Sequence, residues 1–313
     1  MVQHVPPKIS VLIATRNRPA TLERCLASIE ELKINAPWEV IVVSSGDDVT
    51  DVINKFKKIK ILHKHLTTHG QIRQKMAGIK LVSVESEWVL FLDDDVYLFP
   101  DAISQALNSY ESRIDQEEIK GIGFSSYSTK PKELNPNQVK KMRRSKYGSV
   151  MRSGRNLDYM ESNEPVLCEW LNGISMWKCD VLCKYSFDYL DSRYSICEDL
   201  IFSYSVSRNH KLLYVPNAVF NFQTETPIFV TNREVFRANA YWRLFFVSSN
   251  SQLSKYRFLI TQFIRSFTFS FRNDLSFRNS FADFIYSNKI FLDCCLISLY
   301  RLQPLEILKT RKV

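Results

Sequence analysis

The chain has 313 residues, of which 45% are apolar and 24% charged, the balance of a folded protein that can bury a sizeable core. Its formal net charge of +9 favours an anionic partner: nucleotide phosphates, nucleic acid or acidic lipid headgroups. The seven cysteines form no CxxC pair and no secretion signal opens the chain, so reduced thiols in a cytosolic compartment are expected. The five histidines lack zinc-site spacing. No apolar run reaches the roughly 18 residues of a spanning helix, which disfavours a transmembrane protein.

The first third of the chain alternates strands and helices. Residues 9–14 form an apolar run typical of a buried strand, and a polar turn over 15–18 leads to Pro19, which suits the start of a helix. A second strand is expected over 38–43 and a short third one over 58–62. Strand, helix and strand within about 35 residues make a βαβ unit with parallel strands, so the chain opens like a nucleotide-binding half-domain.

A further helix is expected over residues 71–83, directly after Gly70. Arg73 lies in its first turns, where the helix dipole favours negative charge, so a bound anion is one explanation of this cation. The other is an exposed arginine that costs only a few tenths of a kcal/mol.

A strand over residues 88–92 ends in three consecutive carboxylates, Asp93, Asp94 and Asp95. Ligands bind α/β sheets in the crevice outside the carboxyl ends of the strands, so these acids are expected to face a pocket. Asp93 and Asp95 can hold a hard divalent cation whose other positions are filled by water and phosphate oxygens. We therefore predict a metal-diphosphate site, with an acidic turn that caps the next helix as the alternative.

The middle of the chain predicts a helix over 101–110 and a strand over 121–128. Basic and small polar residues then dominate from 130 to 163 without clear periodicity. A segment of this length is either a flap over the site or a solvated loop.

Order returns with apolar segments over 166–177, and a short helix is expected over 179–184. A partly apolar helix follows, with Glu198 and Asp199 in its first turn, where acids are usually caps. Residues 211–215, followed by Pro216 to Asn221, are expected to form a last strand with a turn.

From about residue 231 the alternation stops, and apolar residues recur at helical spacing. Residues 255–313 hold ten Lys or Arg against four Asp or Glu. Helices that are aromatic on one side and basic on the other suit the surface of an anionic membrane. Packing on the preceding domain, or an oligomer interface such as that of a homodimer, is the competing interpretation.

Over roughly residues 8–222 the chain resembles the family 2 glycosyltransferases of the GT-A fold. The resemblance rests on motifs that are weak singly but occur in the family's order and spacing: ISVLIATRNRP at 9–19, GQIR at 70–73, the DxD element FLDDD at 91–95, Asn172-Gly173, and Phe187-Asp188 followed by the ED element Glu198-Asp199. It implies an α/β fold, a Rossmann-like, mostly parallel sheet flanked by helices, with a C-terminal all-helical extension.

The resemblance also implies the domain boundaries. A glycosyltransferase domain is expected over 1–230, with a nucleotide-binding half over about 8–125 and an acceptor-side half over about 165–225. A basic amphipathic helical region is expected over 231–313.

Carried onto this chain, the resemblance implies a set of donor-binding residues: Thr15, Arg16, Arg18, Ser44, Arg73, Asp93 and Asp94. It implies Asp95, with Asp93, as ligands of Mn²⁺ or Mg²⁺, and Asp199 as the catalytic base with Glu198 in support. These roles match the chemistry, because a carboxylate must take the proton of the attacking hydroxyl while cations neutralise the departing diphosphate.

The chain departs from the family pattern at two places. Ser44-Ser45-Gly46 stands where the family usually has an aspartate that contacts the base. Phe220-Asn221-Phe222 stands where many members have a histidine that contributes to the metal site.

The expected function is therefore a metal-dependent, inverting glycosyltransferase that uses a UDP- or dTDP-sugar and a glycan or lipid-linked glycan acceptor. The resemblance implies a cytoplasmic bacterial enzyme peripheral to the inner face of the plasma membrane, and no nucleic-acid partner. One rival is a sugar nucleotidyltransferase, whose Gly-rich, Lys-bearing phosphate loop is missing near the N-terminus. The other is a non-enzymatic, basic nucleic-acid-binding protein. The acidic strand end argues against it, because carboxylates repel the phosphates of nucleic acid.

Overall fold

The computed structural model describes residues 8–34, 38–127, 148–158, 162–185, 196–223, 231–270 and 277–300. The chain divides into two compact units: the first comprises Met1–Ser149, Leu157–Asp191 and Asp199–Thr226, and the second comprises Val150–Asn156, Ser192–Glu198 and Pro227–Val313. The domain boundary predicted after residue 230 stays a prediction. Most of the flap predicted over 130–163 lies outside the described residues.

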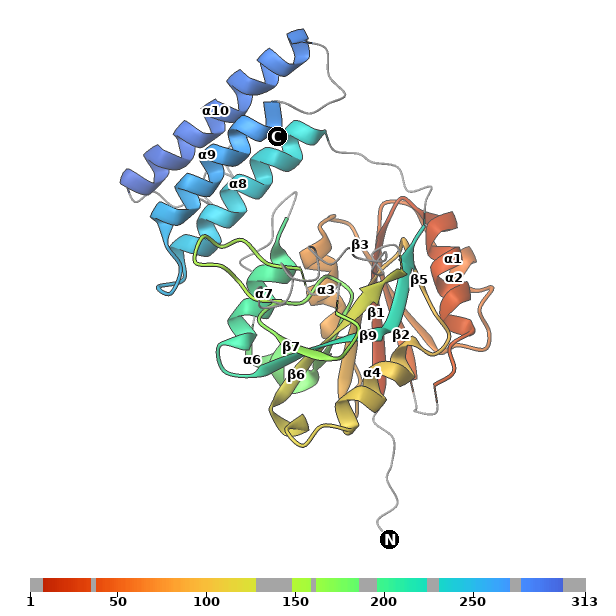
Figure 1. The fold of residues 1–313 in the computed structure, drawn as a ribbon. Helices are drawn as coiled ribbons and strands as arrows, with labels where there is room; N and C mark the ends of the chain where they lie inside the picture. The colour runs from red at the N-terminus through yellow and green to blue at the C-terminus, as the bar shows by residue number, and fades with distance from the viewer. Residues whose placement is uncertain are drawn as a thin grey trace. The chain divides into compact units, whose positions relative to one another are not determined.

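The first unit is built on one mixed sheet flanked by helices (Figure 1). Its described strands are β1 (Ile9–Arg16), β2 (Trp38–Ser45), β3 (Ile61–Leu66), β4 (Trp88–Asp93), β5 (Val96–Leu98), β6 (Ile119–Ser126), β7 (Val166–Cys168), β8 (Ser175–Lys178) and β9 (Lys211–Phe222). They lie in the order β3-β2-β1-β4-β8-β6-β9-β5, and β7 pairs with β9. Because β3, β2, β1 and β4 are parallel, their carboxyl ends meet at one edge.

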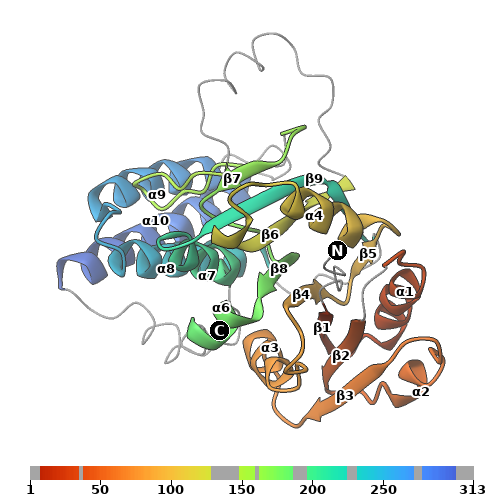
Figure 2. The same cartoon turned by 90° about the horizontal axis from the view of Figure 1, so that it is seen from below.

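Helices cover both faces of β1, β2 and β4, which is why these strands are mostly apolar runs. The helices of the first unit are α1 (Pro19–Glu30), α2 (Thr50–Ile53), α3 (Gln71–Ile79), α4 (Ala102–Glu111), α6 (Cys179–Lys184) and α7 (Glu198–Ser207, whose first residue belongs to the second unit), with a 3₁₀ turn at Gln116–Glu118. Figure 2 shows α1 and α3 on opposite sides of the β1–β3 region. Leu22 of α1 packs in the core with Ile13, while Gly78 of α3 lies against Leu12, the neighbouring residue that points to the other face. The mixed α/β architecture predicted from the sequence is confirmed.

Three elements differ from the prediction by more than two residues or in continuity. β3 covers Ile61–Leu66 rather than 58–62, because its backbone pairs with β2 from Val40↔Ile61 to Ser45↔Leu66 and so draws two histidines into the strand. β9 runs unbroken from Lys211 to Phe222 through pairing with β6 and β5, whereas a turn was expected from Pro216. α3 ends at Ile79, four residues before the predicted end.

The second unit is helical, as predicted for the C-terminal region, with α8 (Asn232–Ser248), α9 (Lys255–Ser270) and α10 (Phe277–Leu299) packed together. Thr231 and Glu234 form a capping box that fixes the start of α8. Arg243 of α8 donates to Gly154 O (2.7 Å) and Asn156 Oδ1 (2.8 Å), which ties residues 150–156 to the helices. Among the described helices, none is both long and apolar enough to cross a bilayer.

Gly121 of β6 lies against buried side chains, so a substitution there tests how tightly the core is packed. A Cβ on Gly121 would lie 2.6 Å from the ring of Trp177, a buried side chain that cannot move aside. We expect Gly121→Ala to lower the free energy of unfolding by about 1–3 kcal/mol through overpacking, measured by urea denaturation. Gly173→Ala is the control, since its Cβ meets no atom closer than 3.8 Å; an equal loss in both variants would contradict the packing argument.

Candidate active site

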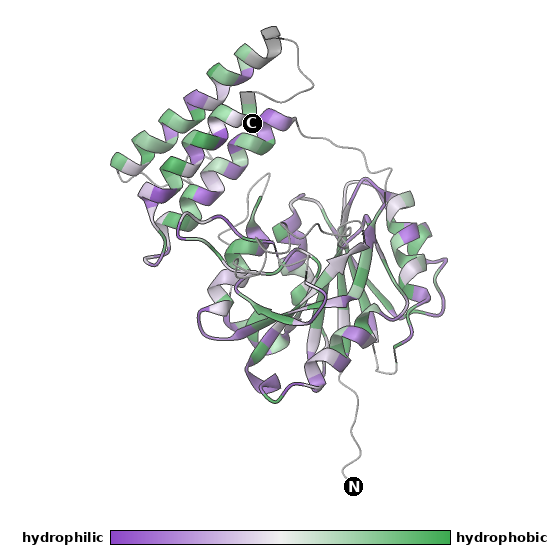
Figure 3. Ribbon diagram, in the orientation of Figure 1, coloured by the Kyte–Doolittle hydropathy of each residue, from purple (hydrophilic) through white to green (hydrophobic). Residues whose placement is uncertain are grey.

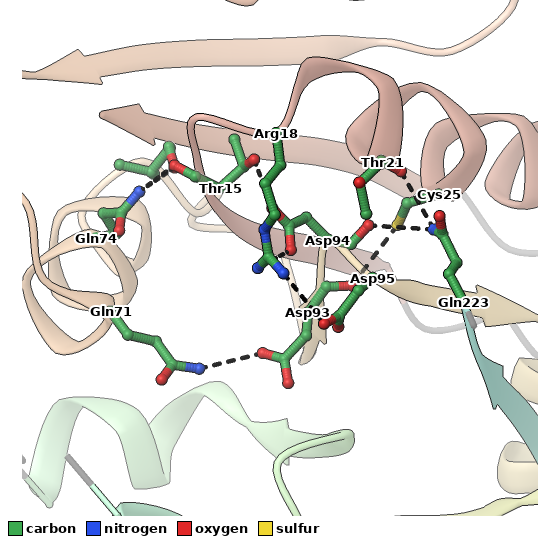
Figure 4. A network of polar contacts seen from close by, with 11 residues as sticks. Thr15, Arg18, Thr21, Cys25, Gln71, Gln74, Asp93, Asp94, Asp95 and Gln223 are labelled. Atoms are coloured by element: carbon green, nitrogen blue, oxygen red, sulfur yellow. Dashed lines mark hydrogen bonds and ion pairs between the residues drawn. The ribbon is translucent and has the colours of Figure 1, made fainter. Parts of the chain in front are cut away.

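The three acids lie where β4 ends and the chain turns into β5 (Figure 4). β1 and β4 pair in parallel with Ala14 opposite Asp93, so the next residue of each strand, Thr15 and Asp94, also lie side by side. The loop after β1 then brings Arg18 back over the acids. Sheet register therefore assembles the predicted cluster from two segments that are almost 80 residues apart.

Asp94 is the buried centre of this cluster, with 0% of its surface exposed. Its Oδ2 accepts a hydrogen bond of 2.6 Å from Thr15 Oγ1, and its Oδ1 forms an ion pair with Arg18. Burial raises the pKa of Asp94 to about 7, although Arg18 and Thr15 both favour the ionised form. Its position and partners make Asp94 a structural acid that joins the turn after β1 to the turn after β4.

Asp93 and Asp95 are half-buried on either side of Asp94. Asp95 Oδ2 accepts from Arg18 Nη1 at 3.2 Å, and Asp93 Oδ1 accepts from Gln71 Nε2 at 3.2 Å. Burial, together with the nearby charge of Asp93, raises the pKa of Asp95. No three His, Cys, Asp or Glu side chains converge within the described ranges, but a cation that also binds phosphate needs only one or two carboxylates. Asp93 and Asp95 supply the number of carboxylates that such a cation takes from protein.

Two glutamines that the sequence reasoning did not single out tie this site to its surroundings. Gln74 Nε2 of α3 donates to Thr15 O (2.6 Å) and Val43 O (2.8 Å), where β1 and β2 end. Gln223, just after β9, donates from its side chain to Asp94 O (3.3 Å) and from its backbone to Asp95 O (2.9 Å). Only the side-chain geometry reveals these contacts, because glutamine carries no distinctive sequence signal.

The predicted donor-binding residue Ser44 lies on β2, the strand beside β1, and its side chain contacts two histidines rather than the three aspartates. Ser44 is opposite Thr15 in the β1–β2 register, and its Oγ lies 2.9 Å from His63 Nε2 and 3.0 Å from His65 Nδ1. Burial lowers the pKa of His63. The Oγ of Ser45, at the very end of β2, is buried without a hydrogen-bond partner in the described part of the chain. The carboxyl end of β2 thus presents a histidine and serine cluster in place of an aspartate.

The two other predicted arginines lie on the surface. Arg16 is the exposed last residue of β1. Arg73 lines a shallow hollow between β3 and α3, together with Lys64, Leu66 and Lys80. Three of the residues that line this hollow are basic: Lys64, Arg73 and Lys80.

Glu198 and Asp199 open α7, as predicted. Asp199 Oδ1 accepts from the backbone N–H of Leu200 at 2.7 Å, and Cys197 before them has a left-handed φ of 68°. Asn172 donates from Nδ2 to Phe124 O (3.0 Å), and Gly173 follows it next to Asp93. A side chain at position 173 would project toward Asp93 Oδ2, so glycine keeps this approach to the acids open.

Residues 10–168, just over half of the chain, match the model of glycosyl transferase family 2. EpsH of Bacillus subtilis (strain 168), which is named as a glycosyltransferase, is 27% identical over 115 residues, which are 35% of this chain and 32% of EpsH. The chain thus spans about a third of that relative.

Two solved structures resemble the whole chain. S. aureus TarS 1–349 in complex with UDP-GlcNAc superposes with a TM-score of 0.59 at 15% identity, over 92% of this chain and 81% of TarS 1–349. The mannosyltransferase PcManGT from Pyrobaculum calidifontis, in complex with GDP-Man and Mn²⁺, superposes with a TM-score of 0.55 at 11% identity, over 96% of this chain and 90% of PcManGT. These likenesses confirm the GT-A fold.

The buried Asp94 predicts a pH dependence of stability in the metal-free protein. Its carboxyl ionises near pH 4 in the unfolded chain but keeps its proton up to about pH 7 when folded. The folded state therefore binds more protons in this window, so the contribution of Asp94 to stability falls as pH rises from 4 to 7, by roughly 4 kcal/mol.

The comparison of wild type with Asp94→Asn tests this contribution, because acids far from Asp94 titrate alike in both proteins. We expect the wild type to lose stability relative to the variant over that window, measured by urea unfolding at several pH values. A difference that stays constant with pH would show that Asp94 has the same pKa in the folded and the unfolded chain.

Proposed function

The chain belongs to glycosyl transferase family 2, and from that premise we propose that it is a glycosyltransferase that transfers a sugar by a metal-dependent, inverting reaction. The donor is a nucleoside diphosphate-sugar with uracil or thymine as its base, and the acceptor is a hydroxyl of a glycan or lipid-linked glycan. The observation that carries the proposal is the arrangement of Asp93 and Asp95 on either side of a buried, immobilised Asp94, at the carboxyl ends of parallel strands.

On the donor side we assign the diphosphate and nucleoside to the segment after β1 and to the acids. Arg16 and Arg18 supply positive charge for the phosphates, and Thr15 and Asp94 hold that segment in place. Asp93 faces the ribose, and Asp95 with Asp93 holds Mn²⁺ or Mg²⁺. When bound, the cation neutralises the charge that develops on the leaving diphosphate. PcManGT was solved with Mn²⁺ and a nucleotide-sugar, which supports this assignment.

On the base side, Ser44 and Arg73 contribute. Ser44 is buried and holds His63 and His65, so we propose that it acts by fixing these two imidazoles at the end of β2 and β3. Arg73 lies in the basic hollow and serves the base or phosphate side of the nucleotide.

On the acceptor side Asp199 takes the proton of the attacking hydroxyl, with Glu198 in support. The hydroxyl oxygen then bonds to the anomeric carbon from the face opposite the diphosphate, and the bond to the diphosphate breaks, which inverts the configuration. A free hydroxyl is a poor nucleophile near neutral pH, so proton removal in the transition state is worth about 10²- to 10⁴-fold. Gly173 leaves room for substrate beside Asp93.

We also propose that the enzyme works at the inner face of the plasma membrane, with the C-terminal helices as the peripheral contact, and without nucleic acid as a partner. A homodimer through those helices is the alternative. The exposed apolar side chains of α9 and α10 support the membrane contact.

Metal-dependent donor binding is tested first. UDP with Mn²⁺ at about 100 times its dissociation constant is expected to stabilise the wild type by about 2.7 kcal/mol, read as a thermal shift against a panel of nucleoside diphosphates. Asp95→Ala is expected to lose the metal-dependent part of that shift. Asp180→Asn, an exposed acid of α6 paired with Lys120, is the control. A full Mn²⁺-dependent shift in Asp95→Ala would place the metal elsewhere.

The catalytic base is tested with a substitution that preserves structure. Asn at position 199 can still accept the hydrogen bond of Leu200 N–H, so Asp199→Asn is expected to fold and to keep the nucleotide shift. Its release of nucleoside diphosphate from the best donor, with water as acceptor, is expected to fall about 10²- to 10⁴-fold. Glu198→Gln serves as the neighbouring comparison, with a loss of about tenfold or less. Turnover at the wild-type rate in Asp199→Asn would overturn the assignment.

A further inference from the structure

The outer faces of α9 and α10 carry an unusually large number of exposed apolar side chains. Ten of them, each 45% to 76% exposed, form what we call the apolar stripe: Tyr256, Ile260, Phe263, Ile264 and Phe267 on α9, and Phe281, Ile285, Leu292, Leu296 and Leu299 on α10. Within each helix their spacings combine steps of three, four and seven residues, so they share one face. Single exposed apolar residues are normal on protein surfaces, but a contiguous group marks an interaction site.

The two halves of the stripe form one continuous surface. α9 and α10 pack along their lengths, and their rings meet across the boundary, with Phe263 5.4 Å from Phe291 and Phe267 6.2 Å from Phe284 between ring centroids. Figure 3 shows hydrophobic residues along both helices. Their other faces are already buried within the chain, for example at Phe258, Ile290 and Cys294.

Charges on these helices are sorted by sign. The two acids of α10 with described side chains turn inward, since Asp283 accepts from Arg233 (2.6 Å) and Asp293 accepts from Tyr241 OH (2.9 Å) of α8. In the described part of α9 and α10 the exposed charged residues are Lys255, Arg257 and Lys289, all positive. The apolar stripe is therefore bordered by cations, and the neighbouring acids are held away from it.

We infer that the apolar stripe and its bordering cations bind the surface of an anionic lipid bilayer, with α9 and α10 lying in the interface. The apolar side chains enter the boundary between headgroups and acyl chains, while Lys255, Arg257 and Lys289 pair with acidic headgroups. The inference rests on the proposed function, because it names the partner of the proposed peripheral contact. It adds the residues and the sign of the lipid charge.

A second copy of the chain fits this surface less well. Two copies that joined stripe to stripe would bring their lysines and arginines together, with no exposed acid on the described part of the face to pair with them. Anionic headgroups supply the missing negative charge, whereas another copy supplies more positive charge.

The test is cosedimentation of the full chain with vesicles of phosphatidylcholine, either alone or with about 30% phosphatidylglycerol. We expect binding to the anionic vesicles to exceed binding to the neutral ones at least tenfold and to weaken as salt is added. The double variant Ile264→Ser/Leu292→Ser removes two apolar side chains that are each more than half exposed, and its binding is expected to fall about tenfold or more. The double variant Lys255→Glu/Lys289→Glu is expected to lose the preference for phosphatidylglycerol.

The matched control is Val84→Ser/Ile114→Ser, which removes two fully exposed apolar side chains from loops of the first unit and is expected to bind like wild type. Binding that does not depend on lipid charge would overturn the inference. So would binding that Ile264→Ser/Leu292→Ser and Lys255→Glu/Lys289→Glu both leave unchanged. So would a wild-type dimer in lipid-free sedimentation that Ile264→Ser/Leu292→Ser converts to monomer, because a second copy would then cover the stripe.

The thermal shift with UDP and Mn²⁺, measured on the same variants, separates this inference from the proposed function. A stripe variant that loses vesicle binding but keeps its nucleotide shift is folded and supports the inference. Absence of any nucleotide shift in the wild type, with vesicle binding intact, would reject the proposed function and leave the lipid surface standing.

Discussion

The site depends on one buried carboxylate. Asp94 has no exposed surface, and a buried acid is stable only where hydrogen bonds and opposite charge replace its water. Thr15 and Arg18 provide both, and they come from the segment that follows the first strand. The cost of burying Asp94 therefore fixes the turn after β1 against the turn after β4, and this fixed junction is what positions Asp93 and Asp95 for a ligand.

Neutral amides complete the junction without changing its charge. Gln74 joins the ends of β1 and β2, Gln71 holds Asp93, and Gln223 joins the end of β9 to the acidic turn. Acids at these positions would add to the repulsion among the three aspartates, and further cations would compete with a metal ion. Glutamine rigidifies the turn without adding charge beside the carboxylates of Asp93 and Asp95.

The sequence predicted the strands that carry the site because β1, β2 and β4 are buried on both faces and read as uninterrupted apolar runs. It misplaced β3, whose alternating His63, Lys64 and His65 carry little strand signal and are held in place by the β2 backbone. It grouped the three aspartates but did not separate their environments, because the burial of Asp94 follows from parallel register with a strand about 80 residues earlier. Local patterns locate charged residues, whereas register decides which of them is buried.

The location of the basic residues bears on which anion they meet. Residues 255–313 hold ten Lys or Arg and four Asp or Glu, so two thirds of the net charge of +9 lies in the last fifth of the chain, outside the unit that holds the three aspartates. A nucleotide bound at those aspartates needs only the few cations beside it. We therefore infer a second anionic partner for the C-terminal region. The exposed cations of α9 and α10 border an apolar stripe, so a partner that matches this surface presents hydrocarbon as well as negative charge, as a lipid surface does.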